Sequence, residues 1–117
     1  MKPRVLLVDD QAAFRAVARE LLEDGGFDVV GEATGAAEAM RSERALRPDV
    51  VLLDVRLPDG TGLDVAQEMS DLDEPPAVVL VSTADYAYAV LGCGARGFLL
   101  KAELSVEALH AVLAARA

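Results

Sequence analysis

The chain has 117 residues, of which 53% are apolar, so it suits one domain, residues 1–117, with one packed core. Its net charge of −9 argues against direct contact with nucleic acid, because duplex binding depends on cationic contacts to phosphates. The single cysteine excludes an internal disulfide and a cysteine-based zinc site, and no apolar run suits a membrane span or a signal peptide, so we expect a cytoplasmic protein.

The first apolar run, residues 5–8, predicts a strand, and Asp9 and Asp10 follow it directly. Apolar residues then recur at helical spacing, which predicts a helix that ends at the glycines 25–26. The expected core face of this helix consists of Phe14, Val17, Ala18, Leu21 and Leu22.

The second and third strands follow in the same pattern. Residues 27–31 predict a strand, and Thr34 can cap a helix that runs to about residue 46. The four apolar residues 50–53 predict a strand buried on both faces, as in the centre of a parallel sheet. Asp54 comes directly after them, where open α/β sheets bind their ligands, and residues 58–62 are expected to form a loop.

A third helix is expected after this loop, and residues 77–81 predict the fourth strand, which is followed by Ser82 and Thr83. Residues 85–91 can form a short helical piece before the glycines at positions 92 and 94.

The fifth strand is predicted at residues 97–100, and Lys101 follows it. Ser105 is expected to cap the last helix. Strands that alternate with helices indicate βαβ units, and therefore a parallel sheet between two layers of helices.

Side chains that can bind a ligand or react follow directly after the predicted strands, at their carboxyl ends. These ends meet at one edge of a parallel sheet. The side chains are those of Asp9, Asp10, Asp54, Ser82, Thr83 and Lys101. Carboxylates crowded together need a cation or raised pKa values, and oxygen ligands without histidine or cysteine favour Mg²⁺. A lysine and a hydroxyl suit a phosphoryl group, which a carboxylate can accept.

Four segments of the sequence carry a family resemblance: residues 4–10, 53–63, 82–84 and 97–101. Together they resemble the receiver domains of two-component response regulators, in the order that this family has them and over essentially the whole chain. The resemblance implies a flavodoxin-like, doubly wound, five-stranded parallel sheet of order 2-1-3-4-5 in a three-layer α/β/α sandwich.

The resemblance also implies roles for the acidic residues. Asp54 matches the phosphoacceptor, which takes a phosphoryl group from a histidine kinase or phosphotransfer protein. Asp10 matches the direct Mg²⁺ ligand, and Asp9 its neighbour, which often acts through water. Arg56 matches the position that binds Mg²⁺ through its backbone carbonyl.

Three further positions match the switching machinery of the family. Thr83 or Ser82 matches the hydroxyl that moves to the phosphoryl group; we prefer Thr83, because Ala84 follows it. Lys101 matches the lysine that pairs with the phosphoryl group, and Phe98 matches the aromatic residue that turns inward on activation.

These matches imply a surface that is controlled by phosphorylation and acts on a downstream effector protein or on a C-terminal output domain. A homodimer that forms on phosphorylation is one form that the output can take. We expect no direct contact of this chain with nucleic acid or with a membrane. Between Thr83 and Lys101 the chain is a few residues shorter than the family usually is, so the resemblance implies a shortened fourth helix. This departure favours an alternative, a receiver-like interaction module that does not depend on phosphate. A hydrolase that forms an aspartyl phosphate is a third hypothesis, but such enzymes commonly have a second Asp where Arg56 stands.

Four other residues have ordinary structural interpretations. Tyr86 and Tyr88 are expected to pack a short helix rather than to form a partner patch. His110 is expected on the surface, and Cys93, between two glycines, is expected to be inert.

Overall fold

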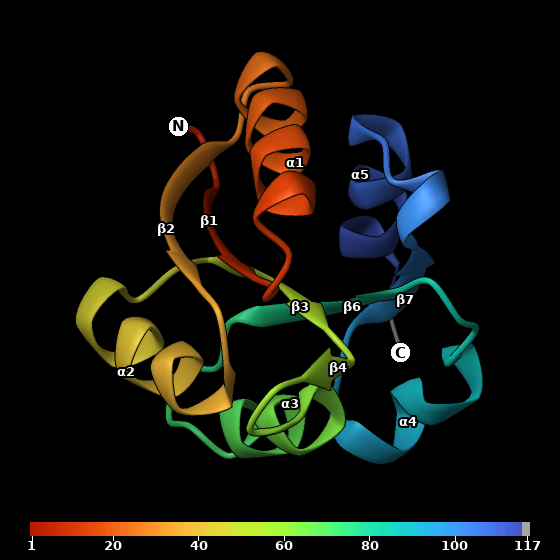
Figure 1. Ribbon diagram of the computed structural model, residues 1–117. Coiled ribbons are helices and arrows are strands. Elements are labelled where there is room, and N and C mark those ends of the chain that lie inside the picture. The colour runs from red at the N-terminus through yellow and green to blue at the C-terminus, as the bar shows by residue number, and fades with distance from the viewer. Residues whose placement is uncertain (116–117) are drawn as a thin grey trace.

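A five-stranded parallel sheet forms the centre of the computed structural model, which describes residues 1–115 (Figure 1). Its strands are β1 (Arg4–Val8), β2 (Asp28–Ala33), β3 (Val50–Asp54), β6 (Ala77–Ser82) and β7 (Gly97–Leu100). They lie in the order β2-β1-β3-β6-β7, and each neighbouring pair is parallel. The predicted order 2-1-3-4-5 is thereby confirmed.

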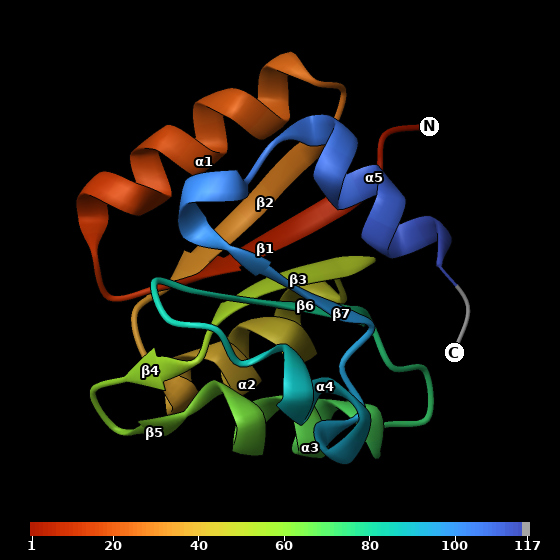
Figure 2. The same ribbon diagram turned by 90° about the vertical axis from the view of Figure 1, so that its right-hand side faces the viewer.

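Helices cover both faces of this sheet (Figures 1 and 2). On one face lie α1 (Ala12–Asp24) and α5 (Val106–Ala114). On the other lie α2 (Ala36–Leu46), α3 (Gly62–Ser70) and α4 (Val90–Cys93). No helix within residues 1–115 is long and apolar enough to cross a bilayer.

Alternate strand residues supply the two apolar cores, as the pleat of a strand requires. In β3, Val51 and Leu53 pack with α2 and α3, whereas Val50 and Leu52 pack with α1 and α5. All five residues of β3 are buried, which confirms the prediction of a central strand covered on both faces.

The predicted core face of α1 is wrong at one residue. Ala18 and Leu22 are fully buried, but the side chain of Val17 is 63% exposed. At 3.6 residues per turn, Val17 lies roughly 100° from the middle of the buried face, so its helical spacing from Phe14 does not bring it to the sheet.

The predicted start of α2 is also wrong. Gly35, not Thr34, is the N-cap residue, and it has no side chain with which to cap the helix. The backbone amides of Ala36 and Ala37 are instead bonded by the carboxylate of Asp59, which follows β3 in the sequence. By contrast, Ser105 caps α5 as predicted, since its hydroxyl accepts a hydrogen bond from Ala108 N at 3.0 Å.

The expected loop after Asp54 contains a small antiparallel ribbon, β4 (Arg56–Leu57) and β5 (Gly60–Thr61), which leads directly into α3. The shortened fourth helix is confirmed: a single 3-10 turn, Ala87–Ala89, precedes an α4 of four residues. In Figure 2 the ribbon lies to the left of α4, which overlaps α3 in this view.

Candidate functional site

Three carboxylates converge at the carboxyl ends of β1 and β3. One oxygen each of Asp9, Asp10 and Asp54 lies within 4.8 Å of the others. Asp54 is the last residue of β3, and Asp9 N still bonds Ala33 O at 3.0 Å, which continues the β1–β2 ladder by one residue. Asp9 and Asp54 are only 1% and 5% exposed, so the parallel sheet buries two acids side by side.

Lys101 provides the positive charge of this cluster. Its Nζ lies 2.7 Å from Asp9 Oδ2 and 3.2 Å from Asp54 Oδ2, and its side chain is 10% exposed. The ammonium also lies 4.6 Å from the centre of the Phe14 ring and donates to Gln11 Oε1 at 3.4 Å. The lysine at the end of β7 therefore reaches the ends of β1 and β3.

Burial and charge shift two pKa values in this cluster. Burial, followed by the neighbouring Asp9, raises the pKa of Asp54, although Lys101 and the Arg56 amide act in the opposite direction. Burial alone lowers the pKa of Lys101, but its contacts with Asp9 and Asp54 outweigh burial and raise it. The lysine thus stays protonated beside two buried acids and leaves an excess of negative charge.

One carboxylate oxygen is left without a proper hydrogen bond. Asp9 Oδ1 accepts from Gln11 N at 2.8 Å. Asp9 Oδ2 is buried, and within residues 1–115 no donor meets it with hydrogen-bond geometry, because Lys101 Nζ is close enough for an ionic contact but poorly aligned. A buried, under-bonded oxygen among three carboxylates fits a site for a cation that prefers oxygen ligands.

The backbone around the acids is held by bonds that the sequence does not reveal. Arg15, one turn into α1, donates through Nη1 to Asp9 O at 2.6 Å and through Nε to Glu32 at 2.7 Å. Arg19 pairs with the other oxygen of Glu32 at 2.8 Å. Sequence reasoning missed Arg15, for which the only signal is a basic residue one turn after an acidic pair.

Asp54 itself receives a backbone bond from the ribbon. Arg56 N donates to Asp54 Oδ1 at 3.3 Å. The Arg56 side chain is exposed and lies beside the phenol of Tyr86, which raises the pKa of the arginine.

The predicted hydroxyls lie across from the acids. Ser82, the last residue of β6, is buried, and its Oγ accepts a hydrogen bond from Ala84 N at 3.2 Å. Thr83, the next residue, is exposed. An open pocket of about 350 Å³ is lined by Asp10, Gln11, Asp54, Arg56, Leu57, Pro58, Ser82, Thr83 and Lys101.

Two predicted residues do not line this pocket: Asp9, which is buried behind it against Lys101, and Phe98. Phe98 lies apart from the acids. It pairs with Leu80 across β6 and β7 and packs, half-buried, against the core beneath α2, α3 and α4. The structure therefore brings the acids, the lysine and both hydroxyls together and leaves the aromatic residue below them.

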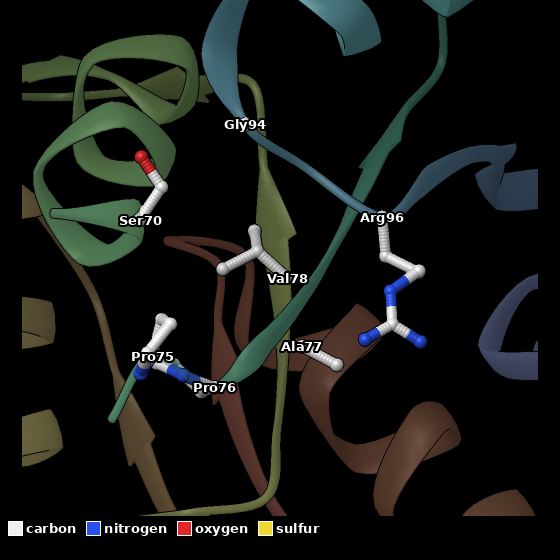
Figure 3. A pocket seen from close by; sticks show the side chains of 7 residues that line it. All are labelled: Ser70, Pro75, Pro76, Ala77, Val78, Gly94 and Arg96. Carbon is white, nitrogen blue, oxygen red and sulfur yellow. The ribbon is translucent and has the colours of Figure 1, made fainter. Parts of the chain in front are cut away.

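A second pocket, of about 160 Å³, lies at the amino end of β6 and contains none of the predicted residues (Figure 3). Its lining residues are Ser70, Pro75, Pro76, Ala77, Val78, Gly94 and Arg96. The Arg96 guanidinium donates to Leu113 O in the last turn of α5, at 2.9 Å, so this side chain has a structural partner.

The interpretations of the four remaining residues are partly right. Tyr86 packs against the core as expected, but Tyr88 is 82% exposed. His110 is exposed, yet its ring stacks on buried Phe27 with the centroids 5.0 Å apart. Cys93 is buried in the apolar core, in line with an inert thiol.

The chain resembles proteins of one family along nearly its whole length. The sequence pattern of the family described as "Response regulator receiver domain" matches residues 5–114. The chemotaxis protein CheY of Thermotoga maritima is 34% identical over 119 residues, which cover 96% of this chain and 98% of that protein. The transcriptional regulatory protein NarL of Mycobacterium tuberculosis is 41% identical over 116 residues, which cover 96% of this chain and 54% of NarL, so the chain spans about half of that relative. The solved structure of the NarL receiver domain from Mycobacterium tuberculosis superposes on this chain with a TM-score of 0.85 and 40% sequence identity. The superposition covers 96% of this chain and 94% of the NarL chain.

Proposed function

The chain belongs to the response regulator receiver domain family, and from this membership we propose that Asp54 accepts a phosphoryl group from a phosphohistidine and thereby changes an output surface. A receiver domain is a phosphoacceptor and not an enzyme that acts on other molecules, which removes the hydrolase hypothesis. The observation that carries the proposal is the convergence of three carboxylates with Lys101, which bridges the two buried ones.

Asp54 is suited to the role of nucleophile. It lines the pocket, and its two oxygens are oriented by Lys101 Nζ and Arg56 N. In the transfer, one carboxylate oxygen forms a bond to phosphorus as the P–N bond to the donor histidine breaks, and the imidazole nitrogen keeps the electron pair. Lys101 then pairs with the new phosphoryl oxygens, so that the added charge of about −1.5 to −2 meets a fixed cation.

The triad of aspartates is typical of the metal-binding site of a receiver domain. We infer that the metal is Mg²⁺, because the donors are all oxygens and Mg²⁺ binds through one or two carboxylates together with phosphate oxygens. Asp10, Asp54 and the backbone carbonyl of Arg56 would hold it, with Asp9 acting through water. When bound, Mg²⁺ supplies positive charge that offsets the oxygens of the transferred group.

For the switch hydroxyl, the register of the sheet supports Ser82 over Thr83. Ser82 pairs with Leu100, and Leu80 pairs with Phe98, so Ser82 and Phe98 lie on the same face of neighbouring strands, two pairs apart. A hydroxyl that moves towards the phosphoryl group from this position vacates space next to the aromatic ring. We therefore propose Ser82 as the switch hydroxyl and Phe98 as the side chain that follows it, in place of our initial preference for Thr83.

The partners follow from the same proposal. The donor is a histidine kinase or a phosphotransfer protein, and the recipient of the signal is a separate effector or an output domain such as NarL-type regulators have, with homodimer formation on phosphorylation as one means of output. We infer a cytoplasmic location, because histidine kinases of two-component systems phosphorylate their receivers there.

Intact-mass measurement with acetyl phosphate and Mg²⁺ tests the proposal. Wild type should gain one phosphoryl group as acetate leaves, and the gain should disappear in Asp54→Asn or when EDTA removes the metal. Because an aspartyl phosphate can hydrolyse during the measurement, beryllofluoride binding is measured in parallel. Absence of both the adduct and beryllofluoride binding would overturn the phosphoacceptor role.

A second function, a phosphate-independent interaction module, is favoured by one observation. The fourth helix, part of the usual output face of the family, is reduced to four residues. Backbone NMR spectra distinguish the two functions. If beryllofluoride binds at Asp54 but shifts no resonance of α4, β7 or α5, the interaction module is correct; shifts that reach β7 support the switch.

A further inference from the structure

The ribbon formed by β4 and β5 directly follows the phosphoacceptor strand. It consists of two residue pairs, Arg56 with Thr61 and Leu57 with Gly60. A two-stranded ribbon of this size is barely stable in water without support from outside. Its geometry nevertheless matters, because it contains the backbone of Arg56.

The base of the ribbon is well fixed. Gly62 N donates to Val55 O at 2.7 Å. Gly62 also packs so closely on the backbone carbonyl of Asp54 that a Cβ at this position would collide with it. These contacts hold the point where the ribbon leaves and rejoins the domain, but they do not hold its tip.

The tip is held by Asp59. Its Oδ1 accepts a hydrogen bond from Ala36 N at 2.6 Å, and its Oδ2 accepts one from Ala37 N at 3.1 Å. These two amides belong to the first turn of α2 and have no partner in their own helix. They also hold the pKa of Asp59 below its usual range, so the carboxylate is ionised at neutral pH.

The place for this carboxylate is built into the neighbouring backbone. Gly35, the N-cap residue, is buried, and a Cβ built on it would lie 2.7 Å from Asp59 Oδ1. The φ of Gly35, −159°, is one that any residue can adopt, so the backbone conformation does not require glycine here. The absence of a side chain instead leaves room for the Asp59 carboxylate.

We propose that Asp59 is a positioning residue for the metal side of the site: by tying the ribbon tip to the first turn of α2, it fixes the backbone carbonyl of Arg56. The assignment rests on the proposed function. Mg²⁺ demands nearly ideal octahedral geometry at 2.0–2.1 Å, so a backbone ligand on a loose ribbon binds it poorly.

Calorimetric titration with Mg²⁺ measures this effect. We expect Asp59→Ala to weaken Mg²⁺ binding about tenfold, as for other outer partners of metal ligands. Asp59→Asn should lose clearly less, because its single carbonyl oxygen can still accept one of the two amides. Both variants remove the same charge, so the difference between them reports the hydrogen bonds and not the electrostatic attraction.

Ser105→Ala is the matched structural control. It removes the N-cap of α5, so it destabilises a helix start without touching the ribbon. Its Mg²⁺ affinity should equal that of wild type, measured at a temperature where all variants are folded by circular dichroism.

Hydrogen exchange gives a readout that does not depend on affinity. If Asp59 couples the metal side to α2, then Mg²⁺ must in turn stabilise the first turn of α2, because coupling is reciprocal. Exchange of the Ala36 and Ala37 amides should slow on addition of Mg²⁺ in wild type but not in Asp59→Ala. The Ala108 amide, which Ser105 caps, should not respond.

The outcomes separate this assignment from the proposed function. Equal affinities of wild type and Asp59→Ala, or an Asp59→Asn variant as weak as Asp59→Ala, would overturn the positioning role. Failure of wild type itself to bind Mg²⁺ would instead overturn the metal-dependent function.

Discussion

The two halves of the site are fixed to different degrees. In the acid half, which consists of Asp9, Asp10 and Asp54, the buried carboxylates are bonded to Lys101 and to backbone amides. In the hydroxyl half, which consists of Ser82 and Thr83, Ser82 pairs with Leu100 in the sheet, but within residues 1–115 the hydroxyls make one side-chain hydrogen bond, from Ala84 N to Ser82 Oγ. No regular element follows until the turn at Ala87–Ala89. The carboxylates expected to bind the metal and the phosphoryl group are thus preformed. The hydroxyl side chains expected to respond to phosphorylation are held by few side-chain contacts.

The largest expected effect comes from removing the cation of the acid half. Lys101→Met leaves two buried carboxylates without their partner, so we expect the free energy of unfolding at neutral pH to fall by about 3 kcal/mol. Urea denaturation measures it. Saturating Mg²⁺ should restore part of the loss, since a second cation replaces the first. Lys2→Met, which changes an exposed lysine, is the control and should have no effect.

The opposite change should stabilise the protein. Burial and Asp9 raise the pKa of Asp54, so its ionised form is disfavoured in the folded state, and Asp54→Asn should raise the free energy of unfolding by about 1 kcal/mol at neutral pH without metal. The sign follows from the shift: the folded state binds the proton more tightly than the unfolded state, so the destabilisation begins above the ordinary pKa of an aspartate and is complete above the raised pKa of folded Asp54.

The advantage of Asp54→Asn should therefore shrink as the pH falls through the raised pKa and vanish below the ordinary value of an aspartate, where both states are protonated. Asp64→Asn, at an exposed position in the first turn of α3, provides the control. A pH-independent difference between wild type and Asp54→Asn would contradict the idea that buried charge causes it.

The backbone of the acid half should depend on Arg15. Arg15→Met keeps the apolar stem but removes the bonds to Asp9 O and Glu32, so we expect a loss of about 1.5 kcal/mol and weaker Mg²⁺ binding. Arg19→Met removes the other partner of Glu32 and leaves Asp9 O bonded. If both variants bind Mg²⁺ equally weakly, the ion-pair network acts through charge and not through the Asp9 backbone.

The smallest effects are expected in the hydroxyl half. Ser82→Ala removes one hydrogen bond and should cost about 0.5–1 kcal/mol, and exposed Thr83→Ala should change stability by less than about 0.5 kcal/mol. Thermal unfolding of both variants provides the values. A Thr83→Ala loss comparable to that of Lys101→Met would show that the hydroxyl half is as firmly built as the acid half.

What could be predicted from the sequence divides along a similar line. Apolar runs in the sequence predict the strands. Asp9, Asp54 and Lys101 directly follow three of these runs, so the parallel pairing of the strands is enough to bring the three side chains to one edge of the sheet. Ser105 caps the helix that begins next to it, which is a local signal. The fold and the acid half could be predicted because they depend on such local patterns and on one rule of topology.

The features that were missed depend on contacts between distant residues. Asp59 caps α2 from 22 and 23 positions away, and nothing near Thr34 indicates that the nearer hydroxyl is not used. Arg15 bonds a backbone carbonyl, which has no sequence signature. Val17 lies three residues after Phe14, a spacing typical of one helix face, but its side chain is exposed. The spacing alone does not show where the buried face of the helix ends.

The pairing of Gly35 with Asp59 has an evolutionary consequence. A serine or aspartate at position 35 could cap α2 from within its own segment, but its side chain would occupy the space of the Asp59 carboxylate. Two ways of beginning α2 are therefore mutually exclusive: a bare glycine with a distant acid, or a local cap with no acid opposite. Positions 35 and 59 should change together among descendants of this sequence, and a lineage that replaces one residue alone passes through a poorly capped intermediate.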